Sequence, residues 1–323
     1  MIAVLLSLLA GMTTPTQSSI NSGLRVRVKS PYIATMVSFA VAVVLTFAIT
    51  MLSIGNINIP YDRILEYPFW IWGGGICGVA IVILNILCLP KLGSANLIML
   101  LSFGQIMTSI IIDNFGLFGA RVIHLSVARI IGALIVISGV ICMSYFGKTT
   151  GVKSGNNRKS KSKGQKSGEV IFIIGALACG AVCAIQVAIN GTLGRLTYSF
   201  LHTTLISMMV GLISTIILMM AIVIFKGKNE IFDKNIYAID KPKFKWWMLL
   251  GGVCAFIIIA SNVIAAPVIG TGMVTVMNLV GQMSGGIIID STGFLGIEKK
   301  PLTVNKVVGI CLMIVGTAVI VLL

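Results

Sequence analysis

Residues 104–119 read GQIMTSIIIDNFGLFG, and residues 281–296 read GQMSGGIIIDSTGFLG. Each stretch ends an apolar run, and each places a carboxylate, Asp113 or Asp290, directly after three isoleucines. A carboxylate beside hydrocarbon is energetically costly. Its recurrence in one register predicts a duplicated membrane unit, and such a unit favours functions that move a solute across a bilayer.

The composition is typical of a membrane protein. Of the 323 residues, 57% are hydrophobic and only 10% are charged, and the mean hydropathy is +1.04. A soluble domain carries roughly 25% charged residues, so this chain lacks the polar side chains to cover a surface in water. Helices are expected because lipid offers no partners to an open sheet edge. Apolar runs long enough to span a hydrocarbon core of ~30 Å occur at ten positions: 2–21, 34–54, 69–89, 95–112, 126–146, 170–189, 203–225, 246–266, 271–289 and 303–323.

The formal net charge of +15 is distributed unevenly between the two predicted sides of the membrane. Arg63, Arg121, Arg129 and Arg195 fall on one side, and all other Lys and Arg residues fall on the other. This is the positive-inside bias, so the charge indicates orientation rather than nucleic-acid binding. It places both termini outside and the segment 147–168 in the cytoplasm. That segment is rich in Ser, Gly and Lys and is predicted to be a disordered basic linker.

Neither a disulfide framework nor a metal site is expected. The seven cysteines all fall within predicted spans and read as small apolar residues: Cys77, Cys88, Cys142, Cys179, Cys183, Cys254 and Cys311. Cys179 and Cys183 are one helical turn apart, but no His or carboxylate accompanies them. The sequence also lacks a P-loop, a Gly-rich nucleotide turn and a Ser/His/Asp set. No cofactor, no ATP use and no enzymatic activity is therefore expected.

The two halves of the chain align with each other through their apolar spans. The aligned pairs include Gly11 with Gly180, Gln17 with Gln186, Asn21 with Asn190, Asn85 with Asn262, Pro90 with Pro267, and Gln105 with Gln282. Each half has five predicted spans, and an odd number makes a continuous chain insert its halves in opposite orientations. The expected fold is all-α, with ten transmembrane helices in a 5+5 inverted repeat: 1–146 is the first repeat, 147–168 the linker and 169–323 the second repeat. Such symmetry is the usual basis of alternating access.

These motifs also carry a family resemblance. The first-span pattern Q-x-x-I-N-x-x-L, the later Asn…Pro-x-x-Gly and the GQ…IIID-x-x-G-x-x-G stretch resemble the YdcZ-type inner-membrane exporters of the drug/metabolite transporter superfamily. The resemblance covers both halves apart from the linker and the loop 226–245, so the chain resembles the fused ten-span form. It implies an EamA-like, drug/metabolite-transporter-like helical fold and transport across the bacterial inner membrane. It does not imply a substrate.

Polar side chains inside the apolar spans are candidates for a solute-binding cavity. Gln105 and Gln282 fall about halfway along their spans and are expected near the midplane, where transporters bind substrates. An interhelical hydrogen bond, worth about 0.6 kcal/mol on average, is the alternative role. The further candidates form equivalent pairs: Gln17 with Gln186, Asn21 with Asn190, and Asn85 with Asn262. Polar packing, or the bonding of carbonyl groups at helix ends, is their alternative role.

Asp113 and Asp290 end the same helices as the two midplane glutamines, and a Gly-rich turn follows each of them. A carboxylate at the edge of the hydrocarbon could carry a proton or act in gating. The alternative is structural, as a cap for the following turn or as one partner of an ion pair with a nearby Arg or Lys.

The leading hypothesis is a secondary transporter, specifically an exporter, of a small organic molecule, with proton coupling as an option. A channel-like permease, a lipid flippase and a membrane enzyme are the alternatives. Sparse charge and the lack of a filter-like carbonyl loop weigh against a channel, and the lack of a clustered acid, base or metal site weighs against an enzyme. The expected partners are a small-molecule substrate and the lipid bilayer, and a homodimer is compatible with the sequence.

Overall fold

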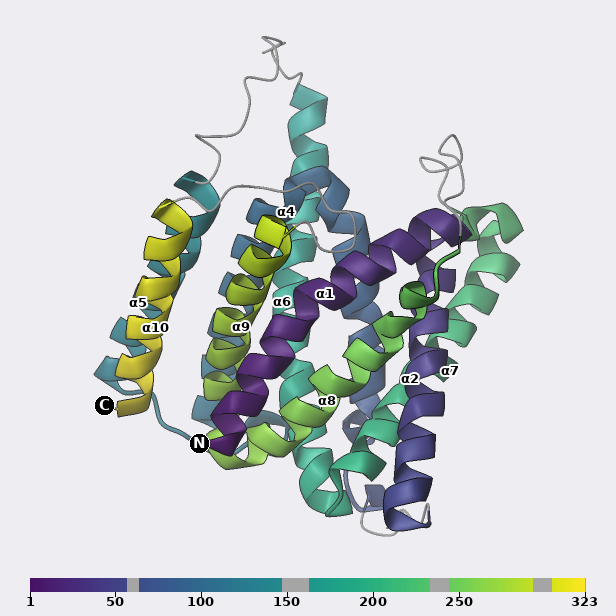
Figure 1. Cartoon of the computed structure of the whole chain (residues 1–323), viewed down its shortest axis with the longest axis horizontal. Coiled ribbons are helices and arrows are strands. Elements are labelled where there is room, and N and C mark those ends of the chain that lie inside the picture. Colours follow the sequence, from purple (N-terminus) through teal and green to yellow (C-terminus); the bar gives the residue numbers. More distant parts are fainter. Residues whose placement is uncertain (57–63, 147–162, 233–243, 293–303, 323) are drawn as a thin grey trace.

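Helices account for the regular structure of the chain. The computed structural model describes residues 1–56, 64–146, 163–232, 244–292 and 304–322, and these residues contain no strand (Figure 1). Helices suit hydrocarbon because each backbone group finds its partner within its own segment. The elements in chain order are α1 (Ile2–Val28), α2 (Pro31–Ile54), η1 (Phe69–Trp72), α4 (Gly73–Phe115), η2 (Leu117–Gly119), α5 (Val127–Phe146), α6 (Lys163–Thr197), α7 (Phe200–Lys226), η3 (Lys228–Ile231), η5 (Trp246–Leu249), α8 (Leu250–Ile269), α9 (Thr271–Thr292) and α10 (Val304–Leu322).

Equivalent serines cap the start of α2 and the start of α7. The Ser30 hydroxyl oxygen accepts a hydrogen bond from the Ile33 backbone N–H at 3.2 Å. The Ser199 hydroxyl accepts one from the His202 N–H at 3.3 Å. Each bond satisfies a donor that the first turn of a helix leaves free, so the sequence sets where both helices begin.

α4 contains both of the spans expected at 69–89 and 95–112, because the helix continues through the residues between them. Its two arms nevertheless run in opposite directions along α6, and the α4 ribbon lies on both sides of α6 in Figure 1. The contacts that establish these directions are Gly74 with Asn190 and Cys88 with Phe172 in the first arm, and Leu101 with Gly180 and Ile112 with Ala188 in the second. The chain therefore reverses within α4.

Close approaches between helices occur in equivalent pairs. A Cβ added at Gly104 would overlap the carbonyl oxygen of Leu177, and a Cβ added at Gly281 would overlap that of Leu8. Small residues let helix backbones approach closely in a membrane, so these glycines determine how the helices pack. The further equivalent approaches are Gly74 to Asn190 with Gly251 to Asn21, Gly75 to Ser207 with Gly252 to Ser38, and Gly139 to Gly309 with Gly316 to Gly132.

The chain ends lie together at one edge of the helix assembly. In Figure 1 α1 begins and α10 ends toward the lower left, whereas α5 ends and α6 begins toward the top. Helices that are equivalent in the sequence repeat run in opposite directions: α1 against α6, α2 against α7, and α5 against α10. The last pair packs together at one side of the molecule, where Gly139 meets the Gly309 backbone.

Several helices are long and apolar enough to cross a membrane. Five meet this description: Pro31–Ile54, Val170–Thr197, Phe200–Lys226, Trp246–Ile269 and Thr271–Ile289. Shorter apolar helices occur at Phe69–Asn85, Leu100–Phe115, Val127–Cys142 and Val307–Gly316. α1 is also long, but the polar stretch Thr13–Asn21 lowers its mean hydropathy. The helices and their composition agree with an all-α membrane protein.

The expected linker 147–168 differs from the structure at its end. α6 begins at Lys163 rather than after residue 168, because a long helix extends past its apolar part into the polar flank. Residues 147–162 lie outside the described part of the chain, so the disorder predicted for that segment stays a prediction.

Candidate functional site

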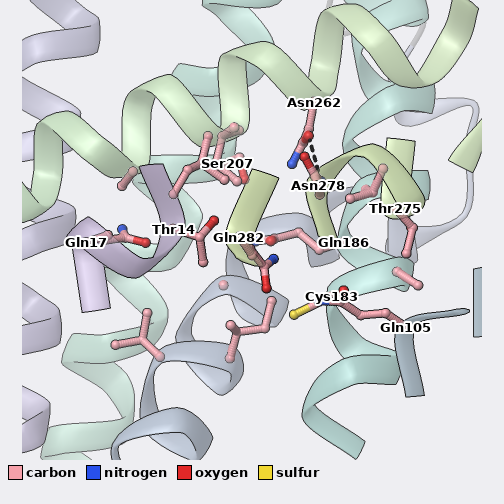
Figure 2. Close-up of a pocket in the computed structure, with 18 of the residues that line it drawn as sticks. Thr14, Gln17, Gln105, Cys183, Gln186, Ser207, Asn262, Thr275, Asn278 and Gln282 are labelled. Carbon is pink, nitrogen blue, oxygen red and sulfur yellow. Dashed lines mark hydrogen bonds between the residues drawn. The ribbon is translucent and has the colours of Figure 1, made fainter. Parts of the chain in front are cut away.

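A cavity of about 110 Å³ lies between α1, α2, α4, α6, α7, α8 and α9 (Figure 2). None of the described side chains that line it carries a charge. Its polar lining consists of six amides, three hydroxyls and one thiol: Gln17, Gln105, Gln186, Gln282, Asn262, Asn278, Thr14, Ser207, Thr275 and Cys183. Aliphatic side chains and Phe39 complete the wall.

The two halves of the chain contribute equivalent residues to this cavity. The aligned pairs in the lining are Thr14 with Cys183, Gln17 with Gln186, Phe39 with Met208, Gly78 with Ala255, Ile81 with Ile258, Val82 with Ile259, and Gln105 with Gln282. The second half also contributes residues whose first-half equivalents are absent from the lining, among them Asn262, Thr275 and Asn278. The cavity therefore lies between the two halves and extends further along the second half.

Gln17 and Gln186 are held by matching hydrogen bonds. The Gln17 side-chain N–H donates to the Gly251 carbonyl oxygen at 3.3 Å, and the Gln186 N–H donates to the Gly74 carbonyl oxygen at 2.9 Å. Because each bond uses the amide nitrogen, the amide oxygen is left for the cavity. Figure 2 shows these oxygens directed toward the space that Gln282 also enters.

Gln105 and Asn278 belong to the cavity lining, and their side-chain oxygens are buried. The two residues are only 5% and 9% exposed. The Asn278 N–H donates to the Asn262 oxygen at 3.1 Å, the dashed line in Figure 2. Within the described part of the chain, neither Gln105 Oε1 nor Asn278 Oδ1 accepts a hydrogen bond. An unsatisfied buried acceptor costs about 1–3 kcal/mol, so both atoms are positioned for a donor that the protein does not supply.

Asn21 and Asn190, equivalent candidates from the sequence, lie outside the cavity lining and differ in their bonding. The Asn21 oxygen accepts a hydrogen bond from the Ser38 hydroxyl at 2.6 Å. The Asn190 oxygen is buried against Gly74 and has no partner among the described residues. Ser207, the equivalent of Ser38, lines the cavity instead. Equivalent Asn and Ser side chains thus have different hydrogen-bond partners and surroundings in the two halves.

Asn85 also lies outside the lining, although its equivalent Asn262 belongs to it. The Asn85 side-chain oxygen accepts a weak hydrogen bond from the Cys179 thiol at 3.8 Å. It therefore contacts α6 and not the cavity. The substrate-binding role expected for Asn21, Asn190 and Asn85 stays a prediction, as it does for the amides that line the cavity.

The sequence candidates did not include Thr14, Cys183, Ser207, Thr275 or Asn278, all of which line the cavity. Asn278 has no polar equivalent, because Leu101 occupies its place in the first half. A search for matched polar pairs therefore passes over it. Its position one helical turn before Gln282 is the signal that could have identified it, because residues four apart share a helix face.

Asp113 is fully buried and connects α4 to the start of α9. Its carboxylate accepts hydrogen bonds from the backbone N–H groups of Thr271 at 3.0 Å and Gly272 at 2.8 Å. An Arg129 nitrogen lies 4.0 Å from the same carboxylate. This arrangement caps the N-terminus of α9, not the turn after α4 that the structural alternative names, and it brings Arg129 close enough for an ion pair. The proton-carrying or gating role expected for Asp113 stays a prediction. The side chain of Asp290 lies outside the described residues.

Two further arginines tie backbone segments together near Asp113. Arg121 donates to the Val268 carbonyl oxygen at 3.2 Å. Arg195 donates to the Gly119 carbonyl oxygen and to the Thr192 hydroxyl. These contacts join the turn after α4 to α6 and to the end of α8, and none of the arginines belongs to the cavity lining. The described residues contain no group of three or more His, Cys, Asp or Glu that could hold a metal ion.

Comparison with known proteins adds a fold match and a family. One of 22 similar solved chains, described only as a crystal structure of a protein, is 15% identical with a TM-score of 0.66, covering 99% of this chain and 96% of that chain. A search of curated proteins finds no match. The family model described as "Putative inner membrane exporter, YdcZ" matches residues 2–142 and again residues 171–319. The predicted resemblance is thereby confirmed: this multi-pass inner-membrane protein belongs to the YdcZ family of the drug/metabolite transporters.

Proposed function

We propose that this protein is a secondary transporter that exports a small organic molecule by alternating access. The observation that carries the proposal is the central cavity, to which the two halves contribute equivalent residues such as Gln105 and Gln282. Midplane polar groups at a repeat interface are where such transporters bind their substrates. The wall of apolar side chains interrupted by a few amides is also typical of small-molecule sites.

The proposed architecture is a 5+5 inverted repeat of ten spans. It is supported by the two matches of one family model and by close approaches that recur in equivalent pairs, such as Gly74 to Asn190 and Gly251 to Asn21. The opposite directions of equivalent helices in Figure 1 also support it. An inverted repeat supplies alternating access because each half can adopt the conformation of the other.

Alternating access is further supported by the unequal state of equivalent groups. The Asn21 oxygen accepts a hydrogen bond from Ser38 at 2.6 Å, whereas the Asn190 oxygen has no partner among the described residues and Ser207 lines the cavity. In the opposite state of the transporter, we expect the Ser207 hydroxyl to donate a hydrogen bond to the Asn190 oxygen and Ser38 to line the cavity. The present conformation then represents one of two related states.

The proposed orientation places both termini outside and the linker in the cytoplasm. The positive-inside bias supports it, and so does the position of both chain ends at one edge of the assembly in Figure 1. Reporter tags at residue 155 and at the C-terminus are expected in opposite compartments. Detection of both tags in one compartment would contradict the proposed inverted repeat.

The test of function is a double substitution of the paired cavity amides, Gln105→Leu with Gln282→Leu. We expect loss of saturable solute flux in proteoliposomes with normal membrane insertion, because leucine keeps the volume and removes the hydrogen-bonding groups. Thr13→Val is the matched control, since the Thr13 hydroxyl bonds the Leu9 carbonyl oxygen of its own helix at 2.7 Å and is absent from the lining. Normal flux in the double variant would reject the proposal, and flux that never saturates would favour a channel.

A further inference from the structure

We infer that the cavity takes an uncharged small molecule that donates hydrogen bonds, received by amide oxygens of its lining. The inference deepens the proposed function and rests on it for the step of transport, whereas binding is tested on its own. Its starting point is a pair of lining residues, Gln105 on α4 and Asn278 on α9, whose buried amide oxygens have no partner among the described residues.

The absence of charged side chains among the described lining residues disfavours ions as ligands. The lining residues include no Asp, Glu, Lys, Arg or His. An ion moved from water into such a site loses its hydration and meets no opposite charge, which is strongly unfavourable. The nearest charged pair described above, Asp113 with Arg129, is internally compensated and lies outside this lining. An uncharged molecule avoids this penalty.

The hydrogen bonds of the lining amides determine whether their nitrogen or their oxygen is left for a ligand. Asn278 uses its N–H on Asn262, and Gln17 and Gln186 use theirs on backbone carbonyl oxygens. The groups left over are oxygens, and those of Gln105 and Asn278 are buried without a donor. A ligand with an N–H or O–H group would supply a donor that the described residues do not. A ligand with acceptors only would not.

The volume limits the size of the ligand in this conformation. A dry cavity of ~150 Å³ accommodates benzene, and this cavity is about 110 Å³. A compact molecule no larger than benzene is therefore a suitable probe for this cavity. The aliphatic wall formed by residues such as Ile81 and Ile258 favours a ligand with an apolar part.

The experiment compares four probes of equal size on the full-length protein in nanodiscs. Butyramide is uncharged with N–H donors, methyl propanoate is uncharged without donors, butyrate is an anion and butyramidinium is a cation. Dissociation constants come from the dependence of the thermal unfolding temperature on probe concentration. We expect butyramide to bind about tenfold more tightly than each of the others, since one unsatisfied acceptor alone is worth ~1–3 kcal/mol.

Gln105→Glu provides a gain of function that misfolding cannot imitate. It places a carboxylate of nearly the same shape in the cavity, so butyramidinium is expected to become the tightest of the four probes. Asn229→Asp makes the same change of amide to carboxylate on the exposed η3 segment and is expected to leave the order of the probes unaltered.

The outcomes separate this inference from the proposed function. If butyramide binds selectively but is not taken up by proteoliposomes, the inference stands and the transport function fails. If wild-type protein binds butyrate, butyramidinium or methyl propanoate as tightly as butyramide, the inference is overturned even where flux is observed. Failure of all four probes to shift the unfolding temperature would overturn it as well.

Discussion

Ser38 and Ser207 are equivalent residues that have different neighbours. Ser38 donates to the Asn21 oxygen at 2.6 Å. Ser207 lines the cavity, and the Asn190 oxygen has no partner within the part of the chain that the structure describes. In an alternating-access cycle, a hydrogen bond made in only one state biases the equilibrium toward that state. The two serines are therefore expected to bias it in opposite directions.

Alanine substitution tests this bias at the scale of single residues. Ser38→Ala removes a bond of about 1 kcal/mol from the present state and is expected to shift the ratio of the two states about fivefold toward the other. Ser207→Ala is expected to shift it the opposite way. The readout is the alkylation rate of cavity-lining Cys183 by a membrane-impermeant reagent, followed by peptide mass spectrometry. Rates that change in the same direction would contradict paired switching.

Matched polar residues identified much of the cavity lining from the sequence, and unmatched ones were missed. Polar residues in apolar spans are rare and usually functional, which made the paired glutamines candidates. The cavity lining includes all four of them: Gln105, Gln282, Gln17 and Gln186. Asn278 was missed because its equivalent is Leu101. The sequence also could not separate Asn262 from Asn85, because equivalent positions lie in different surroundings whenever the two halves occupy different states.

At the scale of elements, the approach of α1 to α9 depends on glycine. A Cβ added at Gly285 would lie 2.7 Å from the Met12 carbonyl oxygen, whereas a Cβ added at Gly286 would meet nothing within 4 Å. The two neighbouring positions thus face different surroundings within one helix, and they form a natural matched pair.

Gly285→Ala is expected to destabilise the protein by about 1–3 kcal/mol because the added methyl group forces α1 away. Gly286→Ala is expected to be neutral or to stabilise by about 0.5–1 kcal/mol, since alanine loses less backbone entropy than glycine in a helix. Thermal unfolding in detergent measures both. Equal destabilisation by the two substitutions would show that contact with α1 is not the cause.

Asp113 stabilises the start of α9 from a different helix. Asp113→Ala removes the acceptor for the N–H groups of Thr271 and Gly272 and is expected to destabilise the protein by about 1–3 kcal/mol. Asp113→Asn keeps one acceptor oxygen and is expected to lie between alanine and wild type. Flux at two pH values is the second measurement. Loss of the pH response in a stable Asp113→Asn variant would assign this carboxylate to proton coupling instead of capping.

Local side-chain bonds define two helix starts that the apolar runs 34–54 and 203–225 place three residues later, whereas the reversal inside α4 has no local signal. Ser30 and Ser199 mark two helix starts through side-chain bonds that are local in sequence. The reversal inside α4 leaves no such local signal, because helical structure continues through it and packing on α6 sets the direction of each arm. The start of α6 at Lys163 was missed for a related reason, since composition alone does not limit how far a helix extends into a polar flank.

At the scale of the whole molecule, the uncharged lining of the cavity determines how the electric field across the membrane acts on transport. A membrane potential of 100 mV does about 2.3 kcal/mol of work on each elementary charge that crosses it. A cavity without ionised side chains that carries an uncharged solute moves no net charge when it changes sides. Reorientation is then expected to be insensitive to voltage.

Flux of butyramide into proteoliposomes should therefore be the same with and without a potassium diffusion potential set by valinomycin. In the Gln105→Glu variant the cavity itself gains a charge, and its flux should acquire a dependence on voltage. A voltage-dependent wild type would mean that an ion accompanies the solute. Without such an ion, the cell cannot drive this export electrically, and the concentration gradient of the solute alone determines the direction of net movement.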